Sequence, residues 1–408
     1  MKERTLWLVY SLAAIVVSVQ KLTQGQREGG YTFYENYVIF KNSFNHLVQG
    51  LNPYAAFPAE QWDLFKYSPA FALFMAPFAA LPDWAGLALW NGLNALVLLA
   101  AILNLPVLTS PQRIFMAWFV LIELVTSLQN SQSNGLTAGL MLWSFIALER
   151  SRPGQAAGHV AAAAFIKIFG LFAGFLALLY PGRLRFAGWL AAWIVFLTTV
   201  PLAVLSAEQL ARVYGWWWDL LRDDHAASVG LSVQGWLQTW FGWTPSKTGI
   251  TLAGLTLFIL STLAPYIPAI LRRTPYIVTR VPSTVHRVPS TVHREPSTVH
   301  RTLACASLLI WSVIFNHKAE SPTFIIALCG VALWWSTAEK KPGEKVLLGL
   351  AFLFVSLSPT DIFPKPLRQQ LVQPYVLKAV PCIVIWGLIT WRMFAGLRRP
   401  VYETLEVS

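Results

Sequence analysis

The sequence WAGLALWNGLNALVLLAAILNL, at residues 84–105, contains no charged side chain. A helix needs about 20 predominantly apolar residues to cross a bilayer. Similar runs recur from Leu6 to Ala395, and the chain is 55% hydrophobic but only 12% charged, which excludes an ordinary soluble enzyme. Backbone groups in a bilayer must be hydrogen-bonded within the protein, and these runs lack the alternating polarity of barrel strands. The sequence therefore predicts an all-α integral membrane protein.

The apolar runs predict about twelve transmembrane helices that form a single polytopic membrane domain over residues 1–408. Placing both termini in the cytoplasm puts all the clusters of Lys and Arg between the runs on one side, as is typical of cytoplasmic loops. The first run lacks a small-residue cleavage site, so we interpret it as a retained span in the cell membrane. The predicted spans are 5–20, 84–105, 112–128, 134–149, 155–166, 168–181, 184–206, 248–272, 302–316, 321–337, 345–358 and 374–395.

The net charge of +12 does not indicate a nucleic-acid partner, because an excess of Lys and Arg is what cytoplasmic loops of a membrane protein carry. The membrane lipids are the expected surroundings. Cys305, Cys329 and Cys382 lie inside apolar runs and share no metal-ligand spacing. We therefore predict no disulfide, no metal site and no cofactor.

Three segments depart from the simple pattern of spans. Residues 69–82 are too few to cross and contain Pro77, so we expect a short helix that dips into the outer face. Residues 155–181 carry Lys167 in the middle, which predicts two short helices that meet at an outer-side Lys167. Residues 280–300 repeat the unit RVPSTVH with little change. Proline at every seventh position excludes a coiled coil. The repeat therefore predicts a cytoplasmic loop over 273–301 that tolerates inserted residues.

This topology gathers the polar segments on the outer face. Two long outer loops, 21–83 and 207–247, are rich in aromatic residues and are predicted to form amphipathic helices on the membrane. Ionisable groups near lipid are costly and indicate a functional site. The alternative interpretation is a structural salt bridge between two of them, such as Lys318 with Glu320 or Asp361 with Lys365. Glu123 lies within a span close to Gln129, and we expect the two to share a polar network.

The candidate site residues divide by chemistry. The cations Lys167, His317, Lys318 and Arg368 are suited to hold a phosphate or pyrophosphate. The carboxylates, of which one is expected to act as a general base on an acceptor hydroxyl, are Glu35, Asp63, Asp223, Asp224, Glu320 and Asp361. Gln132 and Asn134 lie in the polar turn 129–134 and complete the predicted binding residues.

Several motifs in these loops resemble a known family. Residues 35–41 (ENYVIFK), 50–54 (GLNPY), 63–69 (DLFKYSP) and 89–91 (LWN) are similar to the N-terminal half of glycosyltransferase family 87. These are membrane enzymes of the GT-C fold, and they include mannosyltransferases that depend on polyprenol-phosphate-mannose. The segments 129–134, 167–169, 232–235, 316–324 and 358–364 continue the resemblance, which covers most of the chain except the repeat.

The resemblance implies an inverting transfer of a mannose-like hexose from a polyprenyl-phosphate sugar donor to a lipid or glycan acceptor at the extracytoplasmic face. It also implies a catalytic carboxylate in the first outer loop. The usual aspartate of the family falls on Asn36, which cannot act as a base. Either the adjacent Glu35 or Asp63 serves instead, with Glu35 as the first choice, or the chain has lost or altered the reaction.

Two other functions are compatible with a membrane cavity that contains charged groups. A lipid or solute transporter, such as a flippase, also needs a membrane cavity with charged groups, but its halves are often duplicated and its groups reachable from both sides. The sequence shows no internal repeat beyond the heptads, and its polar groups collect on one face. A noncatalytic scaffold of envelope glycan assembly is the other alternative, which the asparagine at position 36 keeps open.

Overall fold

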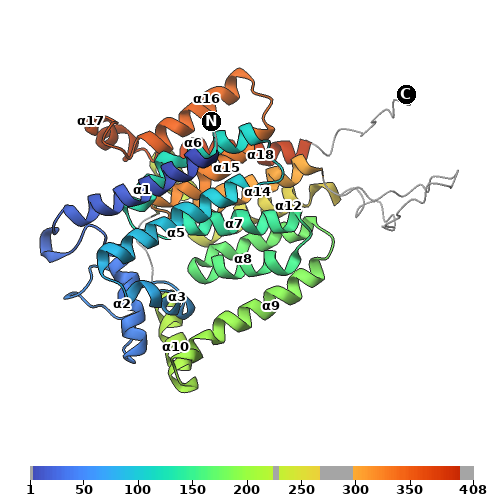
Figure 1. Ribbon diagram of the computed structural model, residues 1–408. Coiled ribbons are helices and arrows are strands. Elements are labelled where there is room, and N and C mark those ends of the chain that lie inside the picture. The colour runs from blue at the N-terminus through green and yellow to red at the C-terminus, as the bar shows by residue number, and fades with distance from the viewer. Residues whose placement is uncertain (1–2, 224–228, 267–296, 396–408) are drawn as a thin grey trace.

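The computed structural model describes residues 3–223, 229–266 and 297–395, and this part of the chain forms helices and no β-strand (Figure 1). Within these residues, four helical segments are long and apolar enough to cross a membrane. They are α1 (Glu3–Thr23), α5 (Asp83–Leu103), α6 (Ser110–Gln129) and Arg183–Ala203, which combines α9 (Arg183–Thr199) with η3 (Val200–Ala203). The prediction of an all-α protein with apolar helices is confirmed, and the number of spans stays a prediction.

The remaining predicted spans also contain helices, most of them shorter than predicted. They are α7 (Asn134–Glu149), α8 (Pro153–Ile166), η2 (Ile168–Leu179), α12 (Lys247–Thr262), α14 (Thr298–Ile314), α15 (Phe324–Thr337), α16 (Pro342–Ala351) and α18 (Val380–Ala395). The short helix η4 (Ala264–Tyr266) follows α12, η5 (Ser321–Thr323) precedes α15, and the π-helical turn η6 (Phe352–Leu357) extends α16. The break predicted at Lys167 is present, because α8 ends at Ile166 and η2 begins at Ile168.

The long loops contain helices of their own, although their placement on a membrane stays a prediction. The first loop forms η1 (Glu28–Gly30), α2 (Glu35–Val48), α3 (Pro69–Phe74) and α4 (Ala76–Ala79). The second forms α10 (Ala207–Asp223) and α11 (Val233–Phe241), and a later loop forms α17 (Lys365–Leu367) and η7 (Arg368–Val372). Segment 69–82 is thus two short helices rather than one, because Pro77 has no N–H to continue α3 and instead stands in the first turn of α4.

The centre of the bundle is the pair α14 and α15, which pack along each other. Every residue of α15 from Phe324 to Trp334 is buried, as expected of a helix that is apolar all round. The two backbones approach closely at Gly330, where an added Cβ would lie 2.6 Å from the carbonyl oxygen of Ala306. Small residues permit this type of contact between membrane helices. The peripheral α9 differs, because Phe186 is its only buried residue.

A second hydrophobic cluster joins the first long loop to the bundle. Phe40 of α2 and Phe71 of α3 meet edge-to-face with ring centroids 5.3 Å apart, and both rings contact Trp90 of α5. The helix α3 also contacts α10. Figure 1 shows α2, α3 and α10 together at the lower left, at one end of the bundle. The first loop is therefore a packed part of the fold.

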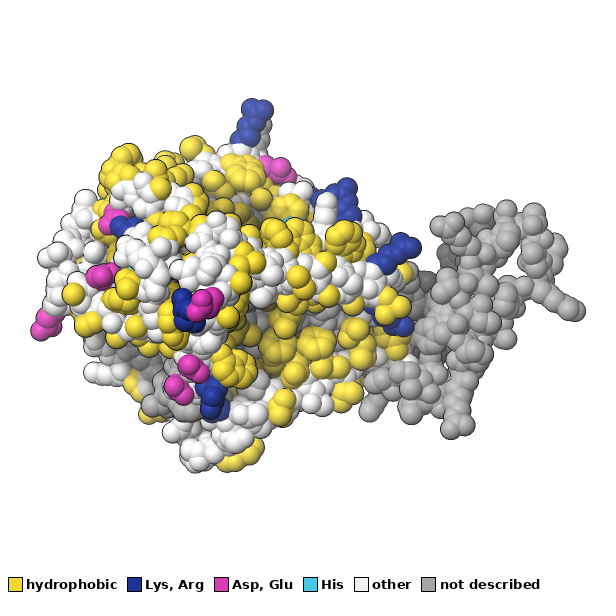
Figure 2. All heavy atoms as spheres, turned by 90° about the horizontal axis from the view of Figure 1, so that it is seen from below, with side chains coloured by type: hydrophobic (Ala, Val, Ile, Leu, Met, Phe, Trp, Pro, Cys, Tyr) yellow, Lys and Arg dark blue, Asp and Glu magenta, His cyan; other side chains and the backbone are white. Residues whose placement is uncertain are grey.

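Basic residues and polar turns lie at opposite ends of the same helices. Arg113 is in the first turn of α6, and Gln129 is its last residue. Arg152 immediately precedes α8, and Lys167 immediately follows it. We call the end with Arg113 and Arg152 the basic end, and the end with Gln129 and Lys167 the loop end. In Figure 2, hydrophobic side chains cover most of the face between the Lys and Arg at its right and the charged groups of both signs spread over its left half.

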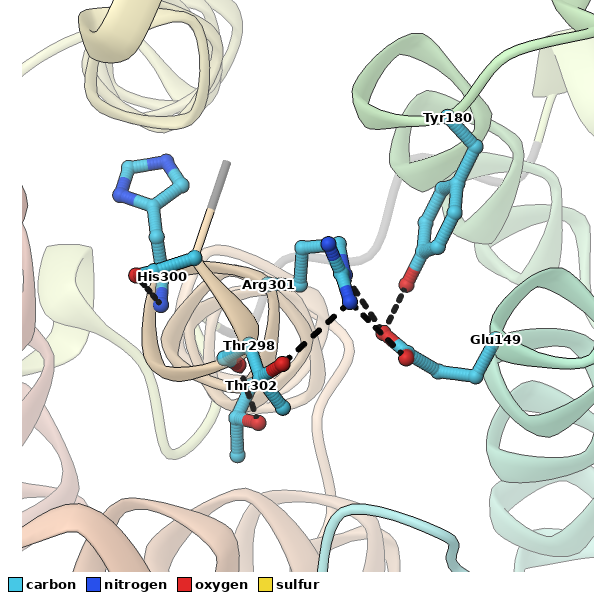
Figure 3. A network of polar contacts seen from close by, with 7 residues as sticks. Glu149, Tyr180, Thr298, His300, Arg301 and Thr302 are labelled. Atoms are coloured by element: carbon cyan, nitrogen blue, oxygen red, sulfur yellow. Dashed lines mark hydrogen bonds and ion pairs between the residues drawn. The ribbon is translucent and has the colours of Figure 1, made fainter. Parts of the chain in front are cut away.

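At the basic end, an ion pair joins three helices (Figure 3). Arg301 of α14 donates from Nε to Oε1 of Glu149 at 2.7 Å and from Nη2 to Oε2 at 3.2 Å. The hydroxyl of Tyr180, which follows η2, donates to Glu149 Oε1 at 2.6 Å. Arg301 comes directly after the heptad repeat. Residues 280–296 of that repeat lie outside the described residues, whereas Ser297 caps α14 by accepting from the backbone N–H of His300 at 3.2 Å.

Candidate active site

A cavity of about 750 Å³ lies at the loop end, within the size range of small-molecule binding sites. Its wall combines segments that are far apart in sequence: the first long loop, the turn 129–134, the break at Lys167, the start of α12 and the loop 316–320. Asp224 lies outside the described residues, and six of the other predicted site residues line the cavity. These are Asp63, Gln132, Lys167, His317, Lys318 and Glu320.

The cavity is rich in cations. Lys167 leaves the end of α8 with its ammonium 5.9 Å from the ring centroid of Tyr67. Burial lowers the pKa of Lys167 to about 8, and the negative charge of Glu320 opposes this shift. Lys318 of the loop 316–320 also lines the cavity. Sequence reasoning missed two further lysines of the wall, Lys66 and Lys247. Lys66 belongs to the quoted motif DLFKYSP, which is the signal that could have found it.

The described part of the cavity wall contains two carboxylates, Asp63 and Glu320. Asp63 accepts from the backbone N–H of Leu64 at 2.7 Å and from the ammonium of Lys66 at 3.2 Å. Glu320 accepts from Nε2 of Gln132 at 2.7 Å. Lysines therefore outnumber the carboxylates on this wall, which favours an anionic ligand.

Asn134 supports the site without lining it. Its side chain is fully buried and donates from Nδ2 to Oε1 of Gln132 at 2.8 Å. Gln132 in turn donates to Glu320, so the amide of Gln132 has a fixed orientation. Asn134 thus acts on the cavity through Gln132.

Glu35 does not reach the cavity. It is 4% exposed, and its Oε2 accepts from the backbone N–H of Thr32 at 3.0 Å and from the Thr32 hydroxyl at 2.9 Å. The next residue, Asn36, does line the cavity and donates from Nδ2 to the carbonyl of Asn130 at 2.8 Å. Successive residues of a helix point about 100° apart, and here Asn36 is turned to the cavity whereas Glu35 is turned to Thr32. We therefore do not retain Glu35 as the candidate base.

Asp223, Asp361 and Arg368 also lie outside the cavity wall. The guanidinium of Arg368 donates to the carbonyls of Pro359 at 3.1 Å and Thr360 at 3.3 Å. These bonds fold the loop 358–368 onto itself. Arg368 therefore stabilises its own loop, and the structure does not bring it to Lys167.

A buried ion pair behind the cavity was not foreseen. Lys378 is 3% exposed, and its ammonium donates to Oε1 of Glu123 at 2.8 Å and to the hydroxyl of Ser321 at 2.7 Å. Glu123 is fully buried. The expected network between Glu123 and Gln129 is wrong, because Gln129 bonds Gln20 instead. Opposite charges in two apolar runs were the available signal, but nothing in the sequence paired them.

The rest of the cavity wall is apolar and aromatic. Phe169 and Phe172 of η2, Trp217 of α10 and Trp311 of α14 contribute rings. Leu252 of α12 also lines it and is 55% exposed, so this part of the wall reaches the surface of the bundle. Such a wall suits a sugar ring or a hydrocarbon chain.

A family model described as glycosyltransferase family 87 matches residues 65–285, which is more than half of the chain. The chain belongs to glycosyltransferase family 87. The match contains the cavity residues Lys66, Gln132, Lys167 and Lys247. Comparison with curated proteins finds no match to the chain. Membership of glycosyltransferase family 87, together with the apolar helices, indicates a membrane glycosyltransferase.

Proposed function

We propose that the protein transfers a mannose-like hexose from a polyprenyl-phosphate donor to a hydroxyl of a lipid or glycan acceptor. The reaction takes place in the cavity at the loop end, which faces the outside of the cell. The observation that carries this proposal is the composition of the cavity wall: four lysines and His317 lie with two carboxylates beside an apolar surface. A donor with a phosphate, a sugar and a hydrocarbon chain matches all three parts.

The cations act on the leaving group. The donor diester carries one negative charge, and its phosphate gains a second as the bond to the anomeric carbon breaks. Lys167, His317 and Lys318 therefore stabilise the transition state more than the bound donor, which is the condition for an increase in rate. A carboxylate of the cavity accepts the proton of the acceptor hydroxyl. Attack from the face opposite the phosphate inverts the anomeric carbon.

The apolar wall holds the first part of the polyprenyl chain. Leu252 and Ile168 line the cavity and are about half exposed, so the chain can leave sideways into the bilayer between α12 and η2. The phosphate then remains at the level of Lys167. A nucleotide sugar has no hydrocarbon chain that would use this wall.

The experiment that tests the proposal uses the purified full-length protein in lipid nanodiscs. It is incubated with undecaprenyl-phosphate carrying labelled mannose, glucose or arabinose and with a membrane lipid extract, and the product is identified by mass. We expect sugar transfer from at least one donor and at least a tenfold loss with Lys167→Met. Lys345→Met, at an exposed position of α16, is the matched control with unchanged transfer. Absence of product from every donor contradicts the proposal, and donor movement across a bilayer without product supports a flippase.

The side of the membrane is tested separately by thiol labelling. The native Cys305, Cys329 and Cys382 are buried, so they contribute little background. With a membrane-impermeant reagent on intact cells, His317→Cys is expected to react and Lys345→Cys to react only after permeabilisation. The reverse pattern would place the cavity in the cytoplasm.

A further inference from the structure

We infer that Glu320 is the catalytic base of the transfer reaction, held in place by Gln132 on one side and by the Lys378–Glu123 ion pair on the other. This inference rests on the proposed function and names the residue that carries out its proton transfer. Within the described residues, the choice lies between the two carboxylates of the cavity wall, Asp63 and Glu320.

The surroundings of Asp63 are unsuited to a base. One carboxylate oxygen accepts from the backbone N–H of Leu64, and the other is paired with the ammonium of Lys66. Proton transfer to Asp63 would leave the Lys66 ammonium beside a neutral acid and so lose their charge attraction. An ionised carboxylate with a cationic partner is better suited to structural support of the loop 63–66 than to taking up a proton.

Glu320 has a different environment. Its Oε2 accepts a hydrogen bond at 2.7 Å from Gln132, a neutral amide, and that bond engages Oε2 alone. The residue is exposed on the loop 316–320, whose other side chains also line the cavity. Lys167 and Tyr67, which the charge of Glu320 influences, line the same cavity. Glu320 thus combines access to the acceptor with proximity to the cation that receives the phosphate.

Buried polar contacts fix the position of Glu320 from both sides. On the side of its carboxylate, Asn134 orients Gln132 through a bond of 2.8 Å. On the side of its backbone, the next residue, Ser321, accepts from Lys378 at 2.7 Å, and Lys378 is bound to Glu123. A catalytic group needs this kind of support, because small displacements from the reactive geometry cost large factors in rate. Lys378 is thus a positioning residue.

The proposed step balances as follows. The acceptor oxygen forms a bond to the anomeric carbon while its proton passes to the Glu320 carboxylate. The bond between the anomeric carbon and the phosphate oxygen breaks, and its electron pair stays on the phosphate beside Lys167. The products are the glycosylated acceptor, polyprenyl phosphate and a protonated Glu320, which releases its proton to water.

The test is Glu320→Gln, which keeps the side-chain shape and an oxygen that accepts from Gln132 but cannot take a proton. We expect kcat to fall by about 10²–10⁴, the range for loss of a general base, with the KM for the donor changed less than about threefold. The rival carboxylate is tested by Asp63→Asn, and a larger loss of kcat there than in Glu320→Gln would overturn the assignment. The matched control is Glu208→Gln on α10, a carboxylate outside the cavity wall with an 84% exposed side chain, for which we expect an unchanged kcat. Glu320→Asp, which keeps a carboxylate, should recover part of the lost kcat. A mere hydrogen-bond acceptor for Gln132 would give no such difference between Gln and Asp.

The outcomes distinguish the role of Glu320 from the proposed function. An active unmodified protein with Glu320→Gln above one tenth of its kcat overturns the role of Glu320 and leaves the proposed function intact. No transfer by the unmodified protein overturns the proposed function itself. Binding of undecaprenyl phosphate to each variant tests whether it is folded. If Glu320→Gln fails to bind it, Glu320→Ala decides: a folded Glu320→Ala that keeps more than one tenth of the unmodified kcat overturns the inference.

Discussion

Removal of the Lys378 ammonium is predicted to destabilise the protein strongly. In Lys378→Met the long side chain remains, but Glu123 loses its cation and Ser321 loses its donor. The Glu123 side chain is fully buried, so water cannot replace the ammonium. The carboxylate must then either remain charged in an apolar surrounding or take up a proton, and both cost free energy.

The magnitude follows from the distance and the burial. At 2.8 Å and an effective dielectric constant of 20, the attraction between the two charges is about 6 kcal/mol, part of which offsets the desolvation of both groups. Breaking a buried pair by removal of one partner typically costs about 3–5 kcal/mol. The pair Arg212–Glu208 has the same separation of 2.8 Å but side chains that are 51% and 84% exposed. For Arg212→Met we therefore expect a loss below about 1 kcal/mol.

Equilibrium unfolding in mixed detergent micelles, followed by tryptophan fluorescence, measures both losses. The double variant Glu123→Gln with Lys378→Met removes both charges and should recover most of the stability, because the buried carboxylate no longer lacks a partner. The reasoning is refuted if Lys378→Met is no less stable than Arg212→Met. It is also refuted if the double variant is as unstable as Lys378→Met.

Two further predictions concern Lys167 and the repeat. The pKa of Lys167 is lowered to about 8, so its charge is present below that pH and lost above it. We therefore expect kcat/KM for the donor to fall about tenfold per pH unit well above pH 8. In Lys167→Arg, which stays charged, this fall should disappear from the measured pH profile. Deletion of residues 282–295 keeps Ser297 and Arg301, so we expect the transfer activity to stay within about twofold. The substitution Arg301→Gln instead removes the cation beside Glu149, whose side chain is 9% exposed. It should lower the free energy of unfolding by about 1–3 kcal/mol in the same unfolding assay.

The helices of the bundle could be predicted because each is encoded locally. The run at 84–105 overlaps α5, and the charge at position 167 marks the break between α8 and η2. The exceptions also have local causes. Pro77 divides the segment 69–82, and residues 168–179 form a 3-10 helix, whose longer rise of about 2 Å per residue lets a short segment span more distance.

The choice between Glu35 and Asn36 could not be made from the sequence, because it depends on the rotation of α2 about its axis. Hydrophobic contacts set that rotation: Tyr37 and Phe40 are buried against α4 and α5, which turns Asn36 to the cavity and Glu35 to Thr32. The same limit applies to Lys378 and Glu123. Their burial was visible in apolar runs, but their pairing joins positions 255 residues apart.

Counting spans assigns each loop to one end of the bundle, and this explains which site residues the sequence could find. Lys167, His317 and Glu320 were grouped because their loops share an end, and the structure brings them to one cavity. Arg368 shares that end by the same count, yet it bonds the carbonyls of its own loop. The alternation of spans fixes the depth of a residue but not its position around the bundle axis. That position depends on helix contacts such as α14 with α15, so it needs the folded structure.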